Sequence, residues 1–207
     1  SLRSFADNFT ADEMKRAVET AHAAGKKVYV TANIFARNAD FSALSDYFRF
    51  LSEIGADAAL VTDAGVFAAA RAAAPALKLH LSTQANTTNK YAAKFWYGEG
   101  AERVVLAREL SVAEISEIRD FCPELQLEAF VHGAMCISYS GRCLLSNYLA
   151  GRDSNRGECV QACRWKYEVR AEGASCPVEE DARGTYIFNS KDLNLIGHLK
   201  ELSEAGV

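Results

Sequence analysis

Four of the six cysteines lie in one short stretch of the chain, and this pattern is the one most suggestive of chemistry. Cys136, Cys143, Cys159 and Cys163 are separated by six, fifteen and three residues. Clustered thiolates select zinc or an iron–sulfur cluster, because both bind sulfur in a roughly tetrahedral arrangement. The spacing matches neither the paired cysteines of zinc ribbons nor the ferredoxin pattern, so the spacing alone does not identify the metal.

Other uses of these cysteines fit the sequence less well. Disulfide bonds are typical of small secreted domains, whereas this chain of 207 residues is 49% hydrophobic and can bury a core of its own. A catalytic cysteine needs a nearby histidine, and Cys136 with His132 could form such a pair. The zinc-protease motif H-E-x-x-H and the hydrolase motif G-x-S-x-G are both absent. Metal ligation is the more economical interpretation of four clustered cysteines.

Positive charge is concentrated around the cysteines, although the whole chain carries a net charge of −4. Between residues 142 and 170 there are three acidic residues and six basic ones, namely Arg142, Arg152, Arg156, Arg164, Lys166 and Arg170. Such a patch could hold a phosphate backbone or an anionic substrate, or it could be a solvated surface loop. No apolar run is long enough to span a bilayer, so we expect no membrane partner.

Apolar runs alternate with helical patterns along most of the chain. The runs that predict buried strands cover residues 27–33, 58–62, 77–82, 103–107, 125–131 and 184–188. Helices are predicted at residues 10–24, 42–54, 65–74, 89–97, 111–121 and 193–204. Capping boxes mark the start of two of these helices, at Thr10 with Glu13 and at Ser111 with Glu114.

The repeated strand–helix units predict an α/β fold, either an open doubly wound sheet or a (β/α)8 barrel. No glycine fingerprint of a nucleotide-binding loop follows any strand. The chain begins in a predicted loop and ends where a further strand is expected, which suggests a fragment of a longer barrel. The alternation of predicted strands and helices stops after residue 131. We therefore expect one barrel-type domain over residues 1–207, with a cysteine-rich insertion at residues 133–183.

In both architectures the active site lies at the carboxyl ends of the strands. Polar residues occupy this position after six successive strands: Asn33, Asp63, Ser82 with Gln84 and Asn86, Arg108 with Glu109, His132, and residues 189–192. As a set they predict a polar pocket, although Asp63 and Asn86 could equally be helix caps or loop residues. His132 could act as a base, lie beside the cysteine site or form a hydrogen-bonded wall. His80, within a strand, is expected to be a hydrogen-bonded core residue.

The cysteine segment resembles the signature of the family known as peptidase U32, the collagenase-like proteases. The matching pattern runs from Glu128 to Ser146 and reads E-x-F-x-x-G-A-M-C-x-x-x-x-G-x-C-x-L-S. The likeness continues to Trp165 and also includes the segments Ser82–Asn86, Arg108–Leu110 and Asn189–Leu193. It covers essentially the whole chain.

The resemblance implies a (β/α) barrel belonging to a longer protein. A first strand, a last barrel strand and a C-terminal β domain would then lie outside this chain. The branch that the chain resembles most forms 5-hydroxyuridine at the wobble position of tRNA without using oxygen, and relatives act on ribosomal RNA or on the ubiquinone ring. The implied partners are tRNA or another RNA and a small anionic hydroxyl donor such as prephenate. The implied location is cytoplasmic.

In this family four cysteines hold a [4Fe–4S] cluster, and zinc is the alternative cofactor. Carried over position by position, the implied metal ligands are Cys136, Cys143, Cys159 and Cys163. Some relatives place a ligand nearer the segment that aligns with Asn189 instead of at the position of Cys163. Cys122 and Cys176 match no ligand position.

The resemblance and the strand ends together suggest roles for individual residues. The predicted catalytic residues are His132, Arg108 and Asp63. The predicted substrate-binding residues are Gln84, Asn86, Arg142, Arg164 and Trp165. Guanidinium groups suit the carboxylates of a donor or the phosphates of tRNA. Trp165 and Tyr139 could stack on a base or cover the cluster from solvent. Two other functions stay open at this point, a peptidase and a zinc-stabilised RNA-binding module.

Overall fold

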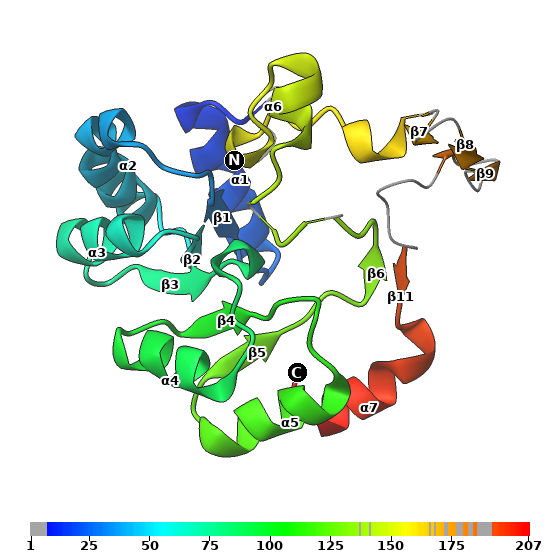
Figure 1. Cartoon of the computed structure of the whole chain (residues 1–207). Coiled ribbons are helices and arrows are strands. Elements are labelled where there is room, and N and C mark those ends of the chain that lie inside the picture. The colour runs from blue at the N-terminus through cyan, green and yellow to red at the C-terminus, as the bar shows by residue number, and fades with distance from the viewer. Residues whose placement is uncertain are drawn as a thin grey trace.

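A parallel sheet of five strands forms the centre of the molecule (Figure 1). The computed structural model describes residues 8–136, 138–140, 142–165, 167 and 192–207, and the backbone of short strands between residues 169 and 185. The strands of the sheet are β1 Tyr29–Ala32, β2 Ala58–Val61, β3 Lys78–Leu81, β4 Arg103–Val105 and β5 Gln126–Glu128. All five lie within the predicted strands, and each is shorter than the apolar run that predicted it.

The strands follow one another in the order β1-β2-β3-β4-β5. In the parallel register, Thr31 of β1 pairs with Leu60 of β2, and Leu60 pairs with His80 of β3. A doubly wound sheet reverses its strand order at a switch point. These five strands show no reversal, so all their carboxyl ends meet along one edge in sequence order.

Helices cover the outer side of the sheet, where α2 packs on α3 and α4 packs on α5 (Figure 1). The helices are α1 Ala11–Ala23, α2 Phe41–Glu53, α3 Ala64–Ala73, α4 Lys90–Gly98, α5 Val112–Phe121, α6 Leu145–Ala150 and α7 Leu199–Glu204. Both predicted capping boxes are present, at Thr10 before α1 and at Ser111 before α5. The core between helices and sheet includes fully buried Phe48, Leu51 and Leu81. None of the helices in the described part of the chain is long and apolar enough to cross a membrane.

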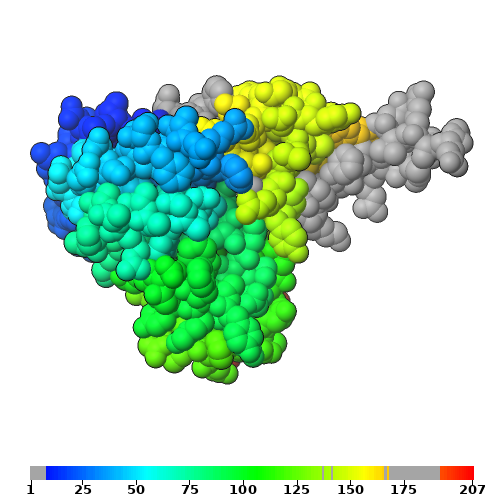
Figure 2. Space-filling model, turned by 60° about the vertical axis from the view of Figure 1, so that its left-hand side comes forward, coloured from blue at the N-terminus to red at the C-terminus, as the bar shows by residue number. Residues whose placement is uncertain are grey.

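The described residues after β5 depart from the strand–helix repeat. They include β6 His132–Gly133, β7 Val169–Ala171, β8 Ala174–Cys176, β9 Glu180–Asp181, β10 Gly184–Thr185 and β11 Leu193–Asn194. Short 3-10 turns are found before β5, at η1 Asn38–Asp40 and η2 Thr83–Ala85, and after it, at η3 Ser154–Arg156, η4 Ala162–Arg164 and η5 Ile196–His198. The yellow part of the chain after β5 lies against the blue surface near the start of α2 (Figure 2).

Two predicted elements near the C-terminus need correction. The helix expected at residues 193–204 begins only at Leu199, because Leu193 and Asn194 pair in antiparallel fashion with β6. The strand expected at residues 184–188 is described only at Gly184–Thr185, and that part pairs antiparallel with Glu180–Asp181 and not with the main sheet. Residues 186–188 lie outside the described residues.

Candidate active site

A cavity of about 790 Å³ opens at the carboxyl ends of the parallel strands. Its walls come from two sources. One wall is formed by strand-end residues, including Asn33, Gln84 and Arg108, and the other by the cysteine segment. The sequence predicts a polar pocket at this edge of the sheet, and the structure places a cavity there, lined by polar and apolar side chains.

Three of the predicted metal ligands, Cys136, Cys143 and Cys159, line this cavity. Cys163, the fourth, does not line it. Burial raises the pKa of the Cys163 thiol, and the neighbouring cysteines raise it further, because one thiolate disfavours another nearby. The five cysteines whose side chains are described are all free thiols. Within the described residues, no three His, Cys, Asp or Glu side chains form a ready-made site for a metal ion.

Hydrogen bonds from α6 and the following turn converge on the sulfur of Cys159. Ser146 is 1% exposed, and its hydroxyl contacts the Sγ of Cys159 at 3.9 Å. The backbone N–H of Gln161 donates to the same sulfur at 3.4 Å. The Ser146 Oγ also accepts from the N–H of Val160 at 3.3 Å, which fixes the hydroxyl in place. Donors of this kind stabilise negative charge on sulfur, as the outer contacts of a metal ligand do.

The floor of the cavity carries buried amide groups. Gln84 is 2% exposed, and its Oε1 lies 3.3 Å from the Thr62 hydroxyl, within hydrogen-bond distance. The Oδ1 of Asn33 is buried and has no hydrogen-bond partner among the described residues. A buried amide oxygen without a partner is costly, so a ligand or water that donates to it would be bound favourably.

Asn86 occupies the left-handed region, with a φ of 54°, directly after the turn that carries Gln84. Its Nδ2 donates to the carbonyl of Gln84 at 3.2 Å and to the carbonyl of Ser140 at 3.4 Å. The side chain therefore fastens the loop after β3 to the loop after Cys136. This contact gives Asn86 a structural role beside the cavity.

Arg108 joins the same two walls from the end of β4. Its Nη2 donates to the Oγ of Ser140 at 2.6 Å, and its Nη1 donates to the carbonyl of Ala134 at 3.2 Å. The guanidinium lies over the ring of Phe130, 5.6 Å from its centroid. Because a guanidinium has five N–H donors, Arg108 keeps donors for an acidic ligand in the cavity.

The structure places two of the predicted catalytic residues outside this cavity. Asp63 is the N-cap of α3, and its Oδ1 accepts from the N–H groups of Gly65 at 2.8 Å and Val66 at 3.1 Å. His132 is exposed on β6, where its backbone pairs with Asn194. Catalytic roles for Asp63 and His132 therefore stay predictions, without geometric support.

The predicted substrate-binding residues on the cysteine segment do not line the strand-end cavity. Arg142 lies over the ring of Phe35, 5.8 Å from its centroid, beside a separate cavity of about 460 Å³. Arg164 forms an ion pair with Asp192 at 2.7 Å. Trp165 is 42% exposed. None of these three residues lines the cavity that holds the cysteines.

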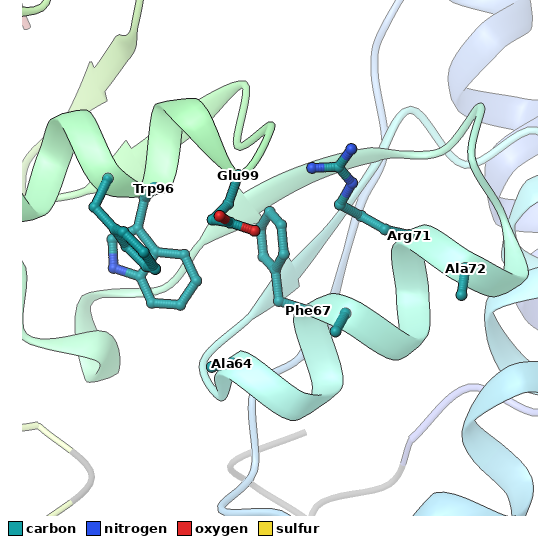
Figure 3. A pocket seen from close by; sticks show the side chains of 8 residues that line it. Ala64, Phe67, Arg71, Ala72, Trp96 and Glu99 are labelled. Carbon is teal, nitrogen blue, oxygen red and sulfur yellow. The ribbon is translucent and has the colours of Figure 1, made fainter.

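Several other residues line the cavity without a role predicted for them from the sequence. Among them are Thr31, Leu60, Glu128, Phe130, Ser140, Ser154 and Asn155. Glu128 and Phe130 belong to the signature pattern, and their fixed positions in it were the available signal. A different hollow, lined by Phe67 and Trp96 and flanked by Arg71 and Glu99, lies between α3 and α4 (Figure 3). It contains none of the predicted site residues.

The sequence profile of Peptidase family U32 matches residues 1–207. The chain belongs to peptidase family U32. Among its relatives is tRNA hydroxylation protein P1 of Bacillus subtilis, which is 45% identical over 210 residues, covering 100% of this chain and 49% of the relative. The tRNA hydroxylation protein P of Escherichia coli is 38% identical over 249 residues, covering 100% and 55% respectively. This U32 chain thus spans about half the length of the curated relatives that it matches.

The solved structure of the U32 peptidase Mk0906 has a similar fold, with a TM-score of 0.56 and 17% sequence identity. The likeness covers 74% of this chain and 61% of that chain. It supports the α/β architecture with its parallel sheet, and at this level of identity it concerns the fold alone.

Proposed function

We propose that this U32 chain is the catalytic part of an RNA hydroxylase that forms 5-hydroxyuridine at the wobble position of tRNA. One observation carries the proposal: Cys136, Gln84 and Arg108 meet around one cavity at the carboxyl ends of the strands. They supply a thiolate ligand, a buried amide and a cation to the same space. The names of the two bacterial relatives support hydroxylation of tRNA.

The proposed cofactor is a [4Fe–4S] cluster held by Cys136, Cys143, Cys159 and Cys163. Two observations support the fit between these residues and such a cluster. Three of the four thiols face a cavity of about 790 Å³, which has room for a multi-iron group, and donors from Ser146 and Gln161 point at one of the sulfurs. When bound, such a cluster would supply one-electron chemistry or a Lewis-acidic iron. Zinc would be the alternative occupant of the same thiols.

The hydroxyl donor would be a small carboxylate of the prephenate type, held by Arg108. In the overall exchange, uracil C5 loses its hydrogen and gains the hydroxyl of the donor, while the donor carbon gains a hydrogen. The uracil is oxidised by two electrons and the donor is reduced by two, so no oxygen is needed. Arg108 suits the carboxylate because a guanidinium can donate two parallel hydrogen bonds.

The buried amides of Gln84 and Asn33 would orient the uracil ring. Uracil presents an N–H donor between two carbonyl acceptors, and the unpartnered Oδ1 of Asn33 needs such a donor. Phe130 is partly exposed at the cavity and could stack on the ring. A base can reach this site only when it leaves its stack, as the exposed wobble base of an anticodon loop can.

We extend the proposal to the surroundings of the site. Arg142 and Arg164 would contact RNA phosphates outside the cavity, and Trp165 would stack on a base there. The sequential strand order supports a (β/α)8 barrel that is completed by strands outside this chain, with residues 133–183 as its cluster-binding insertion. An enzyme acting on tRNA in this way would work in the cytoplasm.

The reaction is tested by mass spectrometry of tRNA nucleosides from a strain that lacks the gene. We expect 5-hydroxyuridine and its derivatives to disappear from the wobble position. They should return with the full-length wild-type gene but not with the Cys136→Ala variant. Normal levels of these nucleosides in the deletion strain, with no second homologue in its genome, would refute the proposed reaction.

The cofactor is tested separately by purifying the full-length protein without oxygen. We expect a brown protein with about four irons per chain, the content of one such cluster. A colourless protein that contains zinc and no iron would instead support the RNA-binding alternative. The peptidase alternative would gain support if the wild-type protein, and not its Cys136→Ala variant, hydrolysed gelatin.

A further inference from the structure

The loop between β1 and α2 is fastened to the part of the cysteine segment that precedes Cys159. The N–H of Phe35 donates to the carbonyl of Asn155 at 2.9 Å. In return, the Nη1 of Arg156 donates to the carbonyl of Phe35 at 2.8 Å. Figure 2 shows the blue surface near the start of α2 lying against the yellow surface of this segment. Two stretches more than a hundred residues apart in sequence are thus joined by one backbone hydrogen bond and one hydrogen bond from a side chain to the backbone.

An ion pair between Asp40 and Arg156 forms the centre of this junction. Arg156 donates to both carboxylate oxygens of Asp40, at 2.7 Å and 3.0 Å. The N–H of Arg37 donates to Asp40 as well, at 2.7 Å. The two side chains of the pair are only 25% and 27% exposed. The hydrogen bonds from Arg156 and Arg37 lower the pKa of Asp40 to about 2. A two-pronged, shielded pair of this kind is among the stronger surface contacts of a protein.

The other side of the same turn holds the cysteines. Ser154 and Asn155 both donate to the carbonyl of Cys143, at 2.7 Å and 3.0 Å. Gly157 turns the chain with a φ of 97°, a conformation that favours glycine. Cys159 follows two residues later. The turn η3 therefore contacts the β1–α2 loop on one side, contacts the Cys143 backbone on the other, and leads directly into Cys159.

We infer that Asp40 and Arg156 are positioning residues that hold Cys143 and Cys159 over the strand-end cavity. We name this contact the cysteine clasp, formed by Phe35, Asp40, Asn155 and Arg156. The clasp acts through the backbone of η3, and neither Asp40 nor Arg156 lines the strand-end cavity. Its role in cofactor retention rests on the proposed function, whereas its effect on the two thiols does not.

The first test measures the thiols without any cofactor. Full-length protein is treated with a chelator and then with a maleimide, and labelling of each cysteine is followed by mass spectrometry. In Asp40→Asn we expect the partly buried Cys143 to react about tenfold faster, which corresponds to the loss of one hydrogen bond between charged groups, and the already exposed Cys159 to change less. Cys122, which is fully buried beneath α5, serves as the internal reference and should keep its rate unless the whole domain unfolds.

The matched control is Asp46→Asn, because Asp46 pairs with Arg49 on the exposed face of α2, the helix that directly follows Asp40, and touches no part of the cysteine segment. Asp40→Glu keeps a carboxylate and should restore much of the protection. Arg156→Lys keeps the positive charge and loses the two-pronged geometry of the guanidinium. If Asp40→Asn does not fold, the labelling rates of Arg156→Lys test the inference instead. Equal labelling rates in Asp40→Asn, Arg156→Lys and the control would overturn the inference.

The second test measures release of iron from the anaerobically purified protein to a chelator. We expect Asp40→Asn to lose iron several-fold faster than Asp46→Asn while its thermal stability stays close to that of the control. Faster thiol labelling in a protein that never contains iron would support the clasp and refute the proposed cofactor. Unchanged labelling in an iron-loaded protein would refute the clasp and leave the proposed function standing.

Discussion

Arg108 at the end of β4 donates a 2.6 Å hydrogen bond to Ser140, which lies in the loop after Cys136. This contact, with the second donation to the carbonyl of Ala134, ties a strand end of the sheet to the cysteine segment. The arginine therefore has two functions in the proposed site. It orders the loop that carries Cys136, and it provides the positive charge of the cavity.

Replacing Arg108 should separate these two functions. In Arg108→Lys the positive charge remains but the paired donors are lost, so we expect kcat/KM for a carboxylate donor to fall about 10- to 100-fold, mainly through KM. Ser140→Ala removes the loop contact and keeps the guanidinium, and it should cost much less. Steady-state hydroxylation of tRNA at varied donor concentration measures both variants. A larger loss in Ser140→Ala than in Arg108→Lys would contradict donor binding by Arg108.

Gln84 should matter for the RNA and not for the donor. Its amide is 2% exposed and lies beside Thr62 at the cavity floor. Gln84→Leu keeps most of the volume and removes both the donor and the acceptor, so we expect KM for tRNA to rise about tenfold or more. KM for the donor should change little. Kinetics with both substrates varied would show the difference, and an effect confined to the donor would refute the assignment.

Cys163 and Cys122 should respond differently to substitution. Cys163 interacts electrostatically with the three cavity cysteines, whereas Cys122 is buried in the hydrophobic core at the end of α5. We expect Cys163→Ser to reduce bound iron after anaerobic purification. Cys122→Ala should leave bound iron unchanged and cost roughly 1 kcal/mol of stability by leaving a small cavity. Full iron content in Cys163→Ser would move the fourth ligand to another residue.

Asp63 offers a test of capping against catalysis. Because its carboxylate accepts two N–H groups at the start of α3, Asp63→Ala should lower the free energy of unfolding by about 1 kcal/mol. Asp63→Ser replaces one good cap by another and should recover most of that loss. Thermal unfolding of the three proteins measures the effect. Hydroxylation by Asp63→Ser then decides whether the carboxylate is also catalytic, because serine caps the helix and cannot replace a carboxylate base.

Much of the α/β body could be predicted from the sequence because its signals are local. Apolar runs, glycine stops and the capping boxes at Thr10 and Ser111 all act within a few residues, and the elements they predict are present. The local pattern predicts a helix at Leu193 and Asn194. Their pairing with β6 is missed because it depends on residues some sixty positions earlier. Long-range pairing leaves no trace in the local pattern.

The residues of the candidate site could likewise be predicted only where the sequence signal is local. Strand-end position singles out Gln84 and Arg108, and both line one cavity. It could not distinguish Asp63, whose side chain turns back to cap its own helix, because capping and catalysis use the same residue type at the same position. The cysteine clasp could not be predicted from the sequence, because Asp40 and Arg156 are far apart along the chain and meet only in the folded structure.

His80 should make stability depend on pH in the mildly acidic range. It is 2% exposed in β3, and its Nδ1 has no hydrogen-bond partner among the described residues, so the expectation of a hydrogen-bonded core histidine is wrong for that atom. Burial, with a smaller effect of the Arg103 charge, lowers its pKa from 6.5 to about 4. The folded state thus favours the neutral ring, and the unfolded state takes up a proton first as the pH falls.

The contribution of a neutral His80 to stability is therefore complete above pH 6.5 and is lost as the pH falls towards 4. Over that interval the free energy of unfolding should fall by at most about 1.4 kcal/mol per pH unit on account of this residue. His80→Leu has no titrating ring, so its stability should decline less steeply between pH 6.5 and 4. Urea unfolding of both proteins at several pH values measures the two slopes. Parallel slopes would mean that His80 is protonated as easily in the folded protein as in the unfolded chain.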